Sequence, residues 1–134
     1  MDPSFGIELP IRYRDLDTFD HVNNAVYGTY LEHARLRYFD RVLEVPLEER
    51  EMVLANLNVD FARPLTLEDR AVRIACGVAD IGGSSFRMEY RVTAASDDEP
   101  SATAETTLVA VEDGRPREIP AEWRERFAEF EADL

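Results

Sequence analysis

The order of two hydrophobic periodicities constrains the fold of this chain more than any other feature. Apolar and polar residues first alternate from Phe5 to Tyr13, which predicts a strand with one buried face. The period then changes to that of a helix, and we expect Asn23 or Asn24 to cap its start and Pro46 to mark its end. The apolar stripe of this helix consists of Tyr27, Tyr30, Leu31, Ala34, Tyr38 and Val42.

Four more alternating segments follow, and they predict further strands at residues 53–61, 72–78, 86–94 and 102–111. Turns are expected at Gly82-Gly83, at residues 96–100 and at Asp113-Gly114. Pro120 suits the first position of a short final helix, whose stripe is Trp123, Phe127, Phe130 and Leu134. Strands and helices do not alternate regularly, so we do not expect a doubly wound parallel sheet. The pattern predicts one α+β domain over residues 1–134, in which a mostly antiparallel sheet packs against one long helix.

The charge balance limits the partners that such a domain can have. With 15 basic and 28 acidic residues, the net charge is -13. An acidic chain repels phosphate backbones, so we expect no nucleic-acid partner. No apolar run reaches the roughly 18 residues of a membrane span, and residues 1–10 lack the features of a secretory signal. We therefore expect a cytoplasmic protein without a membrane partner.

All 15 basic residues are arginine. Together with the excess of acids, this composition resembles that of halophilic proteins, because molar salt shortens the screening length to about 3 Å and removes most self-repulsion. GC-rich coding bias, which also replaces lysine with arginine, is the alternative. The number of acidic residues favours the halophilic interpretation.

Polar residues concentrate between Arg12 and Asn24, in the segment that leads into the long helix. The free N–H groups at a helix start stabilise negative charge, including a developing oxyanion. Glu32 and Arg35 are spaced to form an ion pair on this helix. Asp15 is expected to pair with Arg12 or Arg14.

Several standard motifs are absent. A calcium loop beginning at Asp15 fails because Phe19, Asp20 and Val26 stand at essential positions. The two histidines, His21 and His33, do not form the H-E-x-x-H zinc pattern. The sequence also contains no P-loop, no G-x-G-x-x-G and no G-x-S-x-G. Its one cysteine lies in an alternating run and is interpreted as a core residue. We expect no metal ion and no cofactor.

One block is more specific. It reads Asp15-Leu16-Asp17-Thr18-Phe19-Asp20-His21-Val22-Asn23-Asn24-Ala25-Val26-Tyr27. It is followed by Tyr30-Leu31-Glu32-His33-Ala34-Arg35. These residues resemble the hallmark of hotdog-fold acyl thioesterases, the 4-hydroxybenzoyl-CoA thioesterase-like group. The resemblance extends over residues 5–112. In that family glycine often stands at the position of Asp20, and the related plant enzymes have asparagine at the position of Phe19.

The resemblance implies a five-stranded antiparallel sheet wrapped around the long helix, in a homodimer or homotetramer with its site at the subunit interface. It implies that Asp17 is the catalytic carboxylate, as nucleophile or as general base toward water. The backbone N–H near Asn24 would polarise the thioester carbonyl. His21 matches a histidine that is functional in the related plant acyl-carrier-protein thioesterases. The substrate would be an acyl-CoA or acyl-carrier-protein thioester.

The chemistry of the residues fits this implication. A thiol has a reference pKa near 8.5 and leaves with little help from an acid, so one carboxylate and an electrophilic helix end can suffice. Candidate substrate-binding residues are Asn23, Tyr27, Ser84 and Ser85, which could instead be a helix cap, a core residue and a solvated turn. Two other functions stay open on the same fold. One is an acyl-thioester hydratase or dehydratase that uses His21 with Glu or Asp, and the other is a non-catalytic acyl-thioester binding module.

Overall fold

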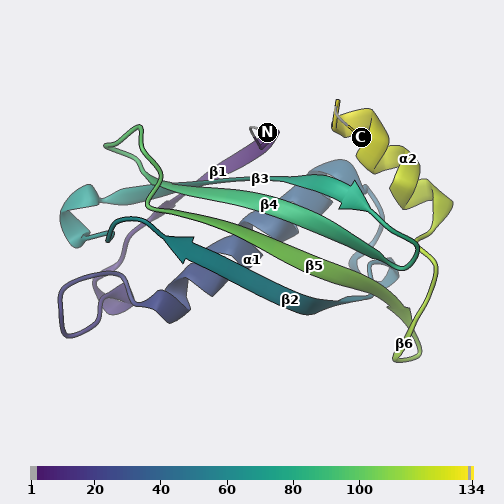
Figure 1. Ribbon diagram of the computed structural model, residues 1–134, viewed down its shortest axis with the longest axis horizontal. Coiled ribbons are helices and arrows are strands. Elements are labelled where there is room, and N and C mark those ends of the chain that lie inside the picture. The colour runs from purple at the N-terminus through teal and green to yellow at the C-terminus, as the bar shows by residue number, and fades with distance from the viewer. Residues whose placement is uncertain (1–2, 133) are drawn as a thin grey trace.

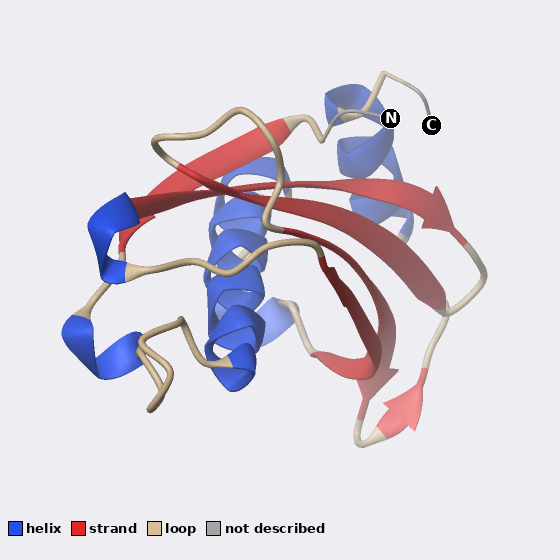
Figure 2. Cartoon of the chain, turned by 60° about the vertical axis from the view of Figure 1, so that its left-hand side comes forward, coloured by secondary structure: helices blue, strands red, loops and turns tan. Residues whose placement is uncertain are grey.

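A sheet curled around one long helix forms the body of the molecule (Figure 1). The computed structural model describes residues 3–132 and 134. Helix α1 (Asn24–Val42) crosses the concave face of the sheet, and helix α2 (Ala121–Phe130) lies at one end of it (Figure 2). Neighbouring strands are antiparallel, in the order β1-β3-β4-β5-β2. The strands are β1 (Phe5–Pro10), β2 (Met52–Phe61), β3 (Ala71–Ile81), β4 (Ser85–Ala94) and β5 (Ala102–Glu112). This arrangement confirms the α+β fold that the periodicities predict.

The first strand is shorter than the alternation predicts. It ends at Pro10, and the 3-10 helix η1 (Tyr13–Asp15) follows after two residues. Proline has no N–H to continue the ladder, so the backbone leaves the sheet there. The alternation predicts Tyr13 on the buried face, yet 81% of its surface is exposed. The alternation therefore overestimates this strand by three residues.

The sequence pattern does not predict three short elements. Two are the 3-10 helices η2 (Leu47–Glu49) and η3 (Leu67–Asp69), and the third is strand β6 (Arg115–Pro116). Strand β6 pairs back onto β5 through the expected turn at Asp113 and Gly114, whose φ angles are 53° and 77°.

The core lies between α1 and the concave face of the sheet. All six residues of the predicted helix stripe are buried. They face inward-pointing residues of β3 and β4, which are Val72, Ile74, Cys76, Val78, Phe86, Met88, Tyr90 and Val92. Full burial of a Leu- or Phe-sized side chain contributes about 1.5–3 kcal/mol, so this layer is a main source of stabilisation. Burial also raises the pKa of the Cys76 thiol to about 12, which confirms the interpretation of Cys76 as an unreactive core residue.

Helix α2 covers one end of the core. Trp123 and Phe127 are buried, and the Phe127 ring lies 5.0 Å from that of Phe86. Pro120 is the N-cap rather than the first helical residue. Leu134, expected on the buried stripe, lies beyond the helix and is exposed, so that part of the prediction is wrong. Among the described residues, no helix has both the length and the apolar character that crossing a bilayer requires.

A buried carboxylate after α2 closes an irregularity in the sheet. The register of β3 against β4 shifts between Val78 and Asp80. There the Glu131 Oε2 accepts hydrogen bonds from the Val78 N–H (3.0 Å) and from the Tyr38 hydroxyl (2.5 Å). Burial, followed by the bond to Glu131, raises the pKa of Tyr38, so the phenol remains a donor. A side chain on Gly77 would collide with this carboxylate, since a Cβ there would lie 3.0 Å from its Oε2.

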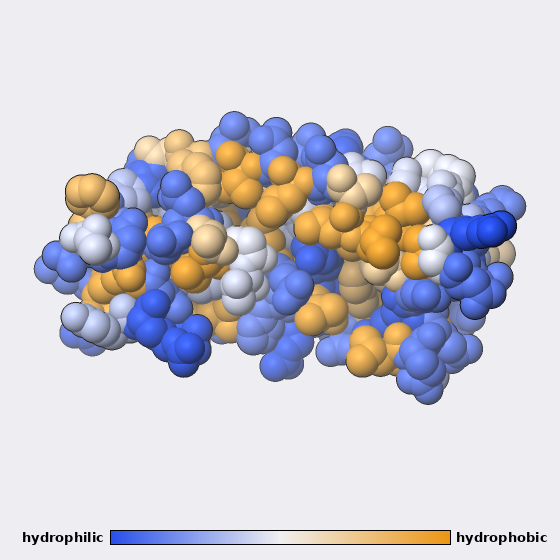
Figure 3. Space-filling model, turned by 90° about the horizontal axis from the view of Figure 1, so that it is seen from below, coloured by the Kyte–Doolittle hydropathy of each residue, from blue (hydrophilic) through white to orange (hydrophobic). Residues whose placement is uncertain are grey.

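Strand β2 forms one edge of the sheet and stays open to solvent. Its register against β5 shifts between Leu54 and Asn56, which identifies a bulge at Ala55. Because a bulge changes the alternation of sides, Met52 and Leu54 face α1 before it, as Leu57 and Phe61 do after it. The single uninterrupted alternation expected for residues 53–61 is therefore wrong. The large apolar residues Val53, Leu54, Leu57 and Phe61 are between 44% and 50% exposed. Apolar side chains gather on this side of the molecule, as Figure 3 shows.

Candidate active site

Asp17, the candidate catalytic carboxylate, lies in a tight loop between η1 and α1. Its backbone N–H donates to the His21 carbonyl oxygen (2.8 Å), and its carbonyl oxygen accepts from the Asp20 N–H (3.1 Å). Its Oδ1 accepts from the N–H groups of Phe19 (2.9 Å) and His21 (3.4 Å). Within residues 3–132 and 134, no hydrogen bond to its Oδ2 is found. That oxygen is available to water or to a substrate carbonyl carbon.

The loop turns back on itself at Asp20, which has a φ of 63°. Glycine adopts this left-handed conformation freely, and aspartate tolerates it better than most residues with a side chain. Asp20 therefore preserves the loop shape at a position where the resembling family often has glycine. The neighbouring Phe19 is 78% exposed, whereas Asp17 itself is half-buried.

The start of α1 presents the positive end of the helix dipole to a ligand. The Asn23 side chain caps the helix by accepting from the Ala25 N–H (2.8 Å), which confirms one of the two predicted caps. No acidic residue lies in the first turn, so no side chain of that turn offsets the dipole. In the described part of the chain, the Asn24 N–H has no hydrogen-bond acceptor. This N–H is therefore a free donor close behind the end of the Asp17 loop.

A buried aspartate holds this loop against the helix. Asp15 is 3% exposed, and its carboxylate accepts from the Arg12 N–H (2.9 Å) and from Arg12 Nη2 (3.2 Å). The Tyr30 hydroxyl also donates to it, at 3.4 Å, and the Asp15 carbonyl oxygen accepts from the Asn23 N–H (2.9 Å). Burial, followed by the Asp15 charge, raises the pKa of Tyr30. The predicted pairing of Asp15 with Arg12 is confirmed, and it positions the helix cap.

The other candidate residues lie in different surroundings. The His21 imidazole is exposed, and no side-chain partner is found for it among the described residues. Tyr27 is buried, with its ring 4.9 Å from that of Phe61, and burial raises its pKa to about 12. Ser84 lies in the β3–β4 turn and Ser85 begins β4, at the opposite end of the sheet from the Asp17 loop (Figure 1). One copy of the chain thus brings together Asp17, His21, Asn23 and Asn24, but not the two serines.

The structure overturns one expected pairing. Glu32 and Arg35 do not form an ion pair, because Arg35 turns into the core and donates to the Tyr90 hydroxyl (3.3 Å). Sequence reasoning missed Arg35 as a residue of interest. One signal was present, since Arg35 lies between Leu31 and Tyr38 on the buried side of the helix.

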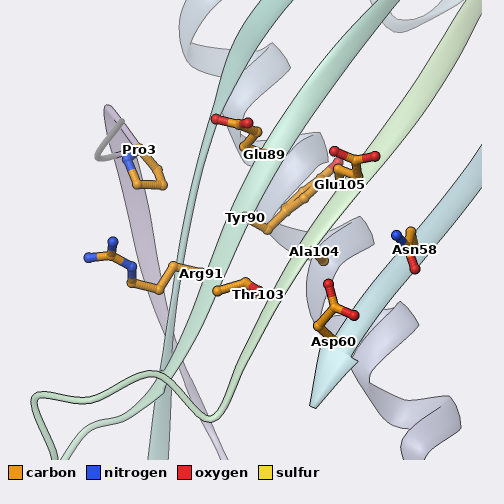
Figure 4. Close-up of a pocket in the computed structure, with 9 residues that line it drawn as sticks. All are labelled: Pro3, Asn58, Asp60, Glu89, Tyr90, Arg91, Thr103, Ala104 and Glu105. Atoms are coloured by element: carbon orange, nitrogen blue, oxygen red, sulfur yellow. The ribbon is translucent and has the colours of Figure 1, made fainter. Parts of the chain in front are cut away.

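A hollow of about 350 Å³ lies on the face of the sheet turned away from α1 (Figure 4). The carboxylates of Asp60, Glu89 and Glu105 line it together with the single guanidinium of Arg91, and it contains none of the candidate site residues. An acidic hollow does not suit an anionic thioester carrier. No group of three His, Cys, Asp or Glu side chains arranged to hold a metal ion is found among residues 3–132 and 134.

Comparisons with known proteins identify the class of protein to which this chain belongs. The family description "Thioesterase-like superfamily" matches residues 11–127. A thioesterase from Thermus thermophilus, solved with coenzyme A and Zn, is 41% identical, with a TM-score of 0.89 over 98% of this chain and 96% of that one. The chloroplastic acyl-acyl carrier protein thioesterase ATL3 of Arabidopsis thaliana is 26% identical over 92% of this chain and 67% of its own length. The long-chain acyl-CoA thioesterase FadM of Escherichia coli (strain K12) is 28% identical over 78% of this chain and 81% of its own length.

The strand order and central helix are those of the hotdog fold. The chain belongs to the Thioesterase-like superfamily and is a thioester hydrolase of the acyl-CoA thioesterase family.

Proposed function

We propose that this chain hydrolyses acyl thioesters of coenzyme A or acyl carrier protein, with Asp17 as the reacting carboxylate. One observation carries the proposal. A carboxylate with an unoccupied oxygen lies in the loop directly before a helix start whose first turn has no acidic residue, and Asp15 fixes that loop to the helix. The relatives support both carriers, since the Thermus enzyme is solved with coenzyme A and the Arabidopsis enzyme is an acyl-acyl carrier protein thioesterase.

The proposed chemistry needs only two protein groups. The Asn24 N–H and the helix dipole stabilise the negative charge that develops on the thioester oxygen. Asp17 Oδ2 either attacks the carbonyl carbon or removes a proton from an attacking water. The thiolate then leaves without a strong acid, because its conjugate thiol has a pKa near 8.5. Asn23 contributes by holding the helix start in place.

We propose that the active form contains two copies joined along β2. A ten-residue edge strand with large exposed apolar side chains is a template for pairing. The other edge, β1, has six residues and ends in proline, which discourages pairing. A twofold axis perpendicular to the sheet relates two identical edge strands as an antiparallel pair. Whether two such dimers combine into a tetramer is a separate step.

Antiparallel pairing would complete the site from both copies. The Phe61 end of β2 packs on Tyr27 in the first turn of α1. Pairing sets that end against the Met52 end of the second copy, which lies near Ser85 because β5 pairs with both strands. The helix start of one copy would then face the second copy's Ser84 and Ser85. This placement supports their assignment to carrier binding.

Replacing Asp17 with asparagine tests the mechanism. The amide oxygen of Asp17→Asn can still accept the loop hydrogen bonds, so the fold and oligomer should be unchanged by circular dichroism and size-exclusion chromatography. Thiol release from a panel of aliphatic and aromatic acyl-CoA substrates should fall by about 10²–10⁴-fold, the usual contribution of such a group. Asp20→Asn in the same loop is the matched control and should retain activity. Full activity of Asp17→Asn would remove the proposed mechanism.

Two alternative functions give different readings in the same assay. A hydratase or dehydratase based on His21 would deplete crotonyl absorbance without releasing thiol. A non-catalytic binding module would bind acyl thioesters and do neither. Family membership favours hydrolysis.

A further inference from the structure

Helix α1 carries an arginine on its buried face. Arg35 is 7% exposed, and its Nη1 donates to the Tyr90 hydroxyl at 3.3 Å. That hydroxyl is also hydrogen-bonded to Thr106 Oγ1, at 2.7 Å. Among the residues that the structure describes, no carboxylate forms an ion pair with Arg35. A largely buried guanidinium that lacks an anion is costly, so an anionic partner at this position would be favourable.

Arg35 also lines a cavity of about 370 Å³ between α1 and the start of β2. The rest of its wall is mostly apolar, from Leu36, Phe39, Leu47, Met52, Leu54 and Leu108, and its other charged members are Glu32 and Arg50. Ser101 Oγ and Arg117 Nε are the buried side-chain atoms without a partner in the described chain, so the remaining nitrogens of Arg35 still reach solvent. Because Arg35 lines this cavity, we infer that the cavity is the route by which they do so. The volume lies within the usual range of ligand pockets, about 300–1,000 Å³.

The cavity lies where the acyl group would go in the proposed dimer, and the inference rests on that proposed function. Met52 and Leu54 belong to the cavity wall, whereas Phe61 packs beside the helix start. Antiparallel pairing of two β2 strands sets these ends against each other. The reacting carbonyl bound at one copy's Asn24 would therefore extend its acyl group toward the other copy's Arg35.

We propose that Arg35 is a specificity-determining residue that selects acyl groups bearing a carboxylate remote from the thioester. The apolar wall would contact the methylene chain, and the guanidinium would pair with the terminal carboxylate through charge-assisted hydrogen bonds. An unsubstituted alkyl chain would displace water from Arg35 and leave the guanidinium N–H groups without a hydrogen-bond acceptor. A site built around a polar partner rejects the analogue that lacks it.

The wild-type protein provides the first test. Octanoyl-, decanoyl- and dodecanoyl-CoA are each compared with the ω-carboxyacyl-CoA of equal length, by thiol release. We expect kcat/KM to favour the ω-carboxy substrate at one of these lengths by about tenfold or more, the size of one hydrogen bond to a charged group. Preference for the alkanoyl substrate at all three lengths would overturn the proposal.

Arg35→Met removes the charge and keeps much of the side-chain length. The ratio of kcat/KM between the ω-carboxy and alkanoyl substrates should fall about tenfold to a hundredfold. The exposed Arg37→Met on the same helix is the matched control and should leave the ratio unchanged. Arg35→Lys keeps a charge but loses the planar fork, so its ratio should lie between the two, and it serves if Arg35→Met does not fold. Equal losses for both substrates, or dissociation of the oligomer, would assign Arg35 to structure and overturn the proposal.

A binding measurement separates this inference from the catalytic one. Calorimetric titration of Asp17→Asn with each substrate pair reports affinity without turnover. Tighter binding of the ω-carboxy member supports the role of Arg35 even if the carboxylate mechanism fails. Equal binding of the pair, in a protein that hydrolyses thioesters through Asp17, refutes the role of Arg35 alone.

Discussion

Three aspartates of one short loop have different environments and different tasks. Asp15 is buried and holds the helix cap, Asp17 leaves one oxygen unoccupied, and Asp20 turns the backbone in the left-handed region. Residue type alone does not separate them. Their tasks differ because the surrounding backbone forms hydrogen bonds with different atoms of each aspartate.

The conformation at Asp20 gives a stability prediction. Asp20→Gly should match or exceed the wild-type free energy of unfolding, because glycine adopts a φ of 63° without strain. Asp20→Val should lower that free energy by about 1–2 kcal/mol, since a branched Cβ disfavours the left-handed region. Urea unfolding followed by circular dichroism measures both, with Thr18→Val in the same loop as control. Equal stability of the glycine and valine variants would contradict the assignment.

The residue-scale predictions succeeded where a signal is local. The Asn23 cap and the pairing of Asp15 with Arg12 depend on neighbours in sequence, and both are confirmed. The Glu32–Arg35 pair failed because the same spacing fits an exposed ion pair and a buried stripe equally well. Choosing between them requires knowing that Tyr90 lies opposite, at a position far along the chain.

At the scale of elements, strand β2 and helix α1 together form the exposed apolar side of the molecule (Figure 3). The presence of the strands and helices could be predicted from periodicity, because each buries one face. The bulge at Ala55 could not, since alternation looks continuous through it and the shift exists only against β5. The end of β1 at Pro10 could not be predicted either. It depends on the N–H group that proline lacks, and hydropathy carries no information on backbone N–H groups.

The edge position of β2 predicts how the oligomer can be broken. Leu57→Arg places a charge among apolar side chains and should convert the proposed dimer to monomers, in the way that natural edge strands avoid pairing. Analytical ultracentrifugation gives the mass directly. Ala128→Arg, on the exposed side of α2, adds the same charge away from β2 and should leave the mass unchanged. An unaltered dimer in Leu57→Arg would place the interface elsewhere.

At the scale of the whole molecule, the net charge of -13 opposes both compactness and the approach of an anionic carrier. Salt screens both effects. We predict that the melting temperature and the rate of acyl-CoA hydrolysis rise as potassium chloride increases to about 1 M, where the screening length is about 3 Å. Differential scanning calorimetry and initial rates measure them. A melting temperature that does not change with salt, or an activity maximum at low salt, contradicts the halophilic interpretation.

Buried tyrosines predict a loss of stability in alkali. Burial is the largest cause that raises the pKa of Tyr27, to about 12 from 10.0, and it also raises that of Tyr30 and Tyr38. Above about pH 10 the unfolded chain loses these protons while the folded chain keeps them, so the free energy of unfolding falls as pH rises. Below that pH the contribution is fully present.

Each tyrosine contributes at most about 1.4 kcal/mol per pH unit to this slope. Urea unfolding between about pH 9 and pH 12 should show the decline, and Tyr27→Phe should make it less steep. The exposed Tyr13→Phe is the control. An identical slope in Tyr27→Phe and wild type would show that Tyr27 does not carry the effect.

The contacts around Gly77 determine how the two ends of the chain relate. Ser4 Oγ and Glu131 Oε2 both approach this one residue of β3, since a Cβ on Gly77 would lie 2.9 Å and 3.0 Å from them. Residues 4 and 131 therefore lie close together in the fold. A short peptide joining residues 4 and 131 would permit the chain to be opened at the acidic turn between β4 and β5. The new ends of the resulting circular permutant would interrupt no strand. Every strand pairing and the Asp17 loop would therefore be kept.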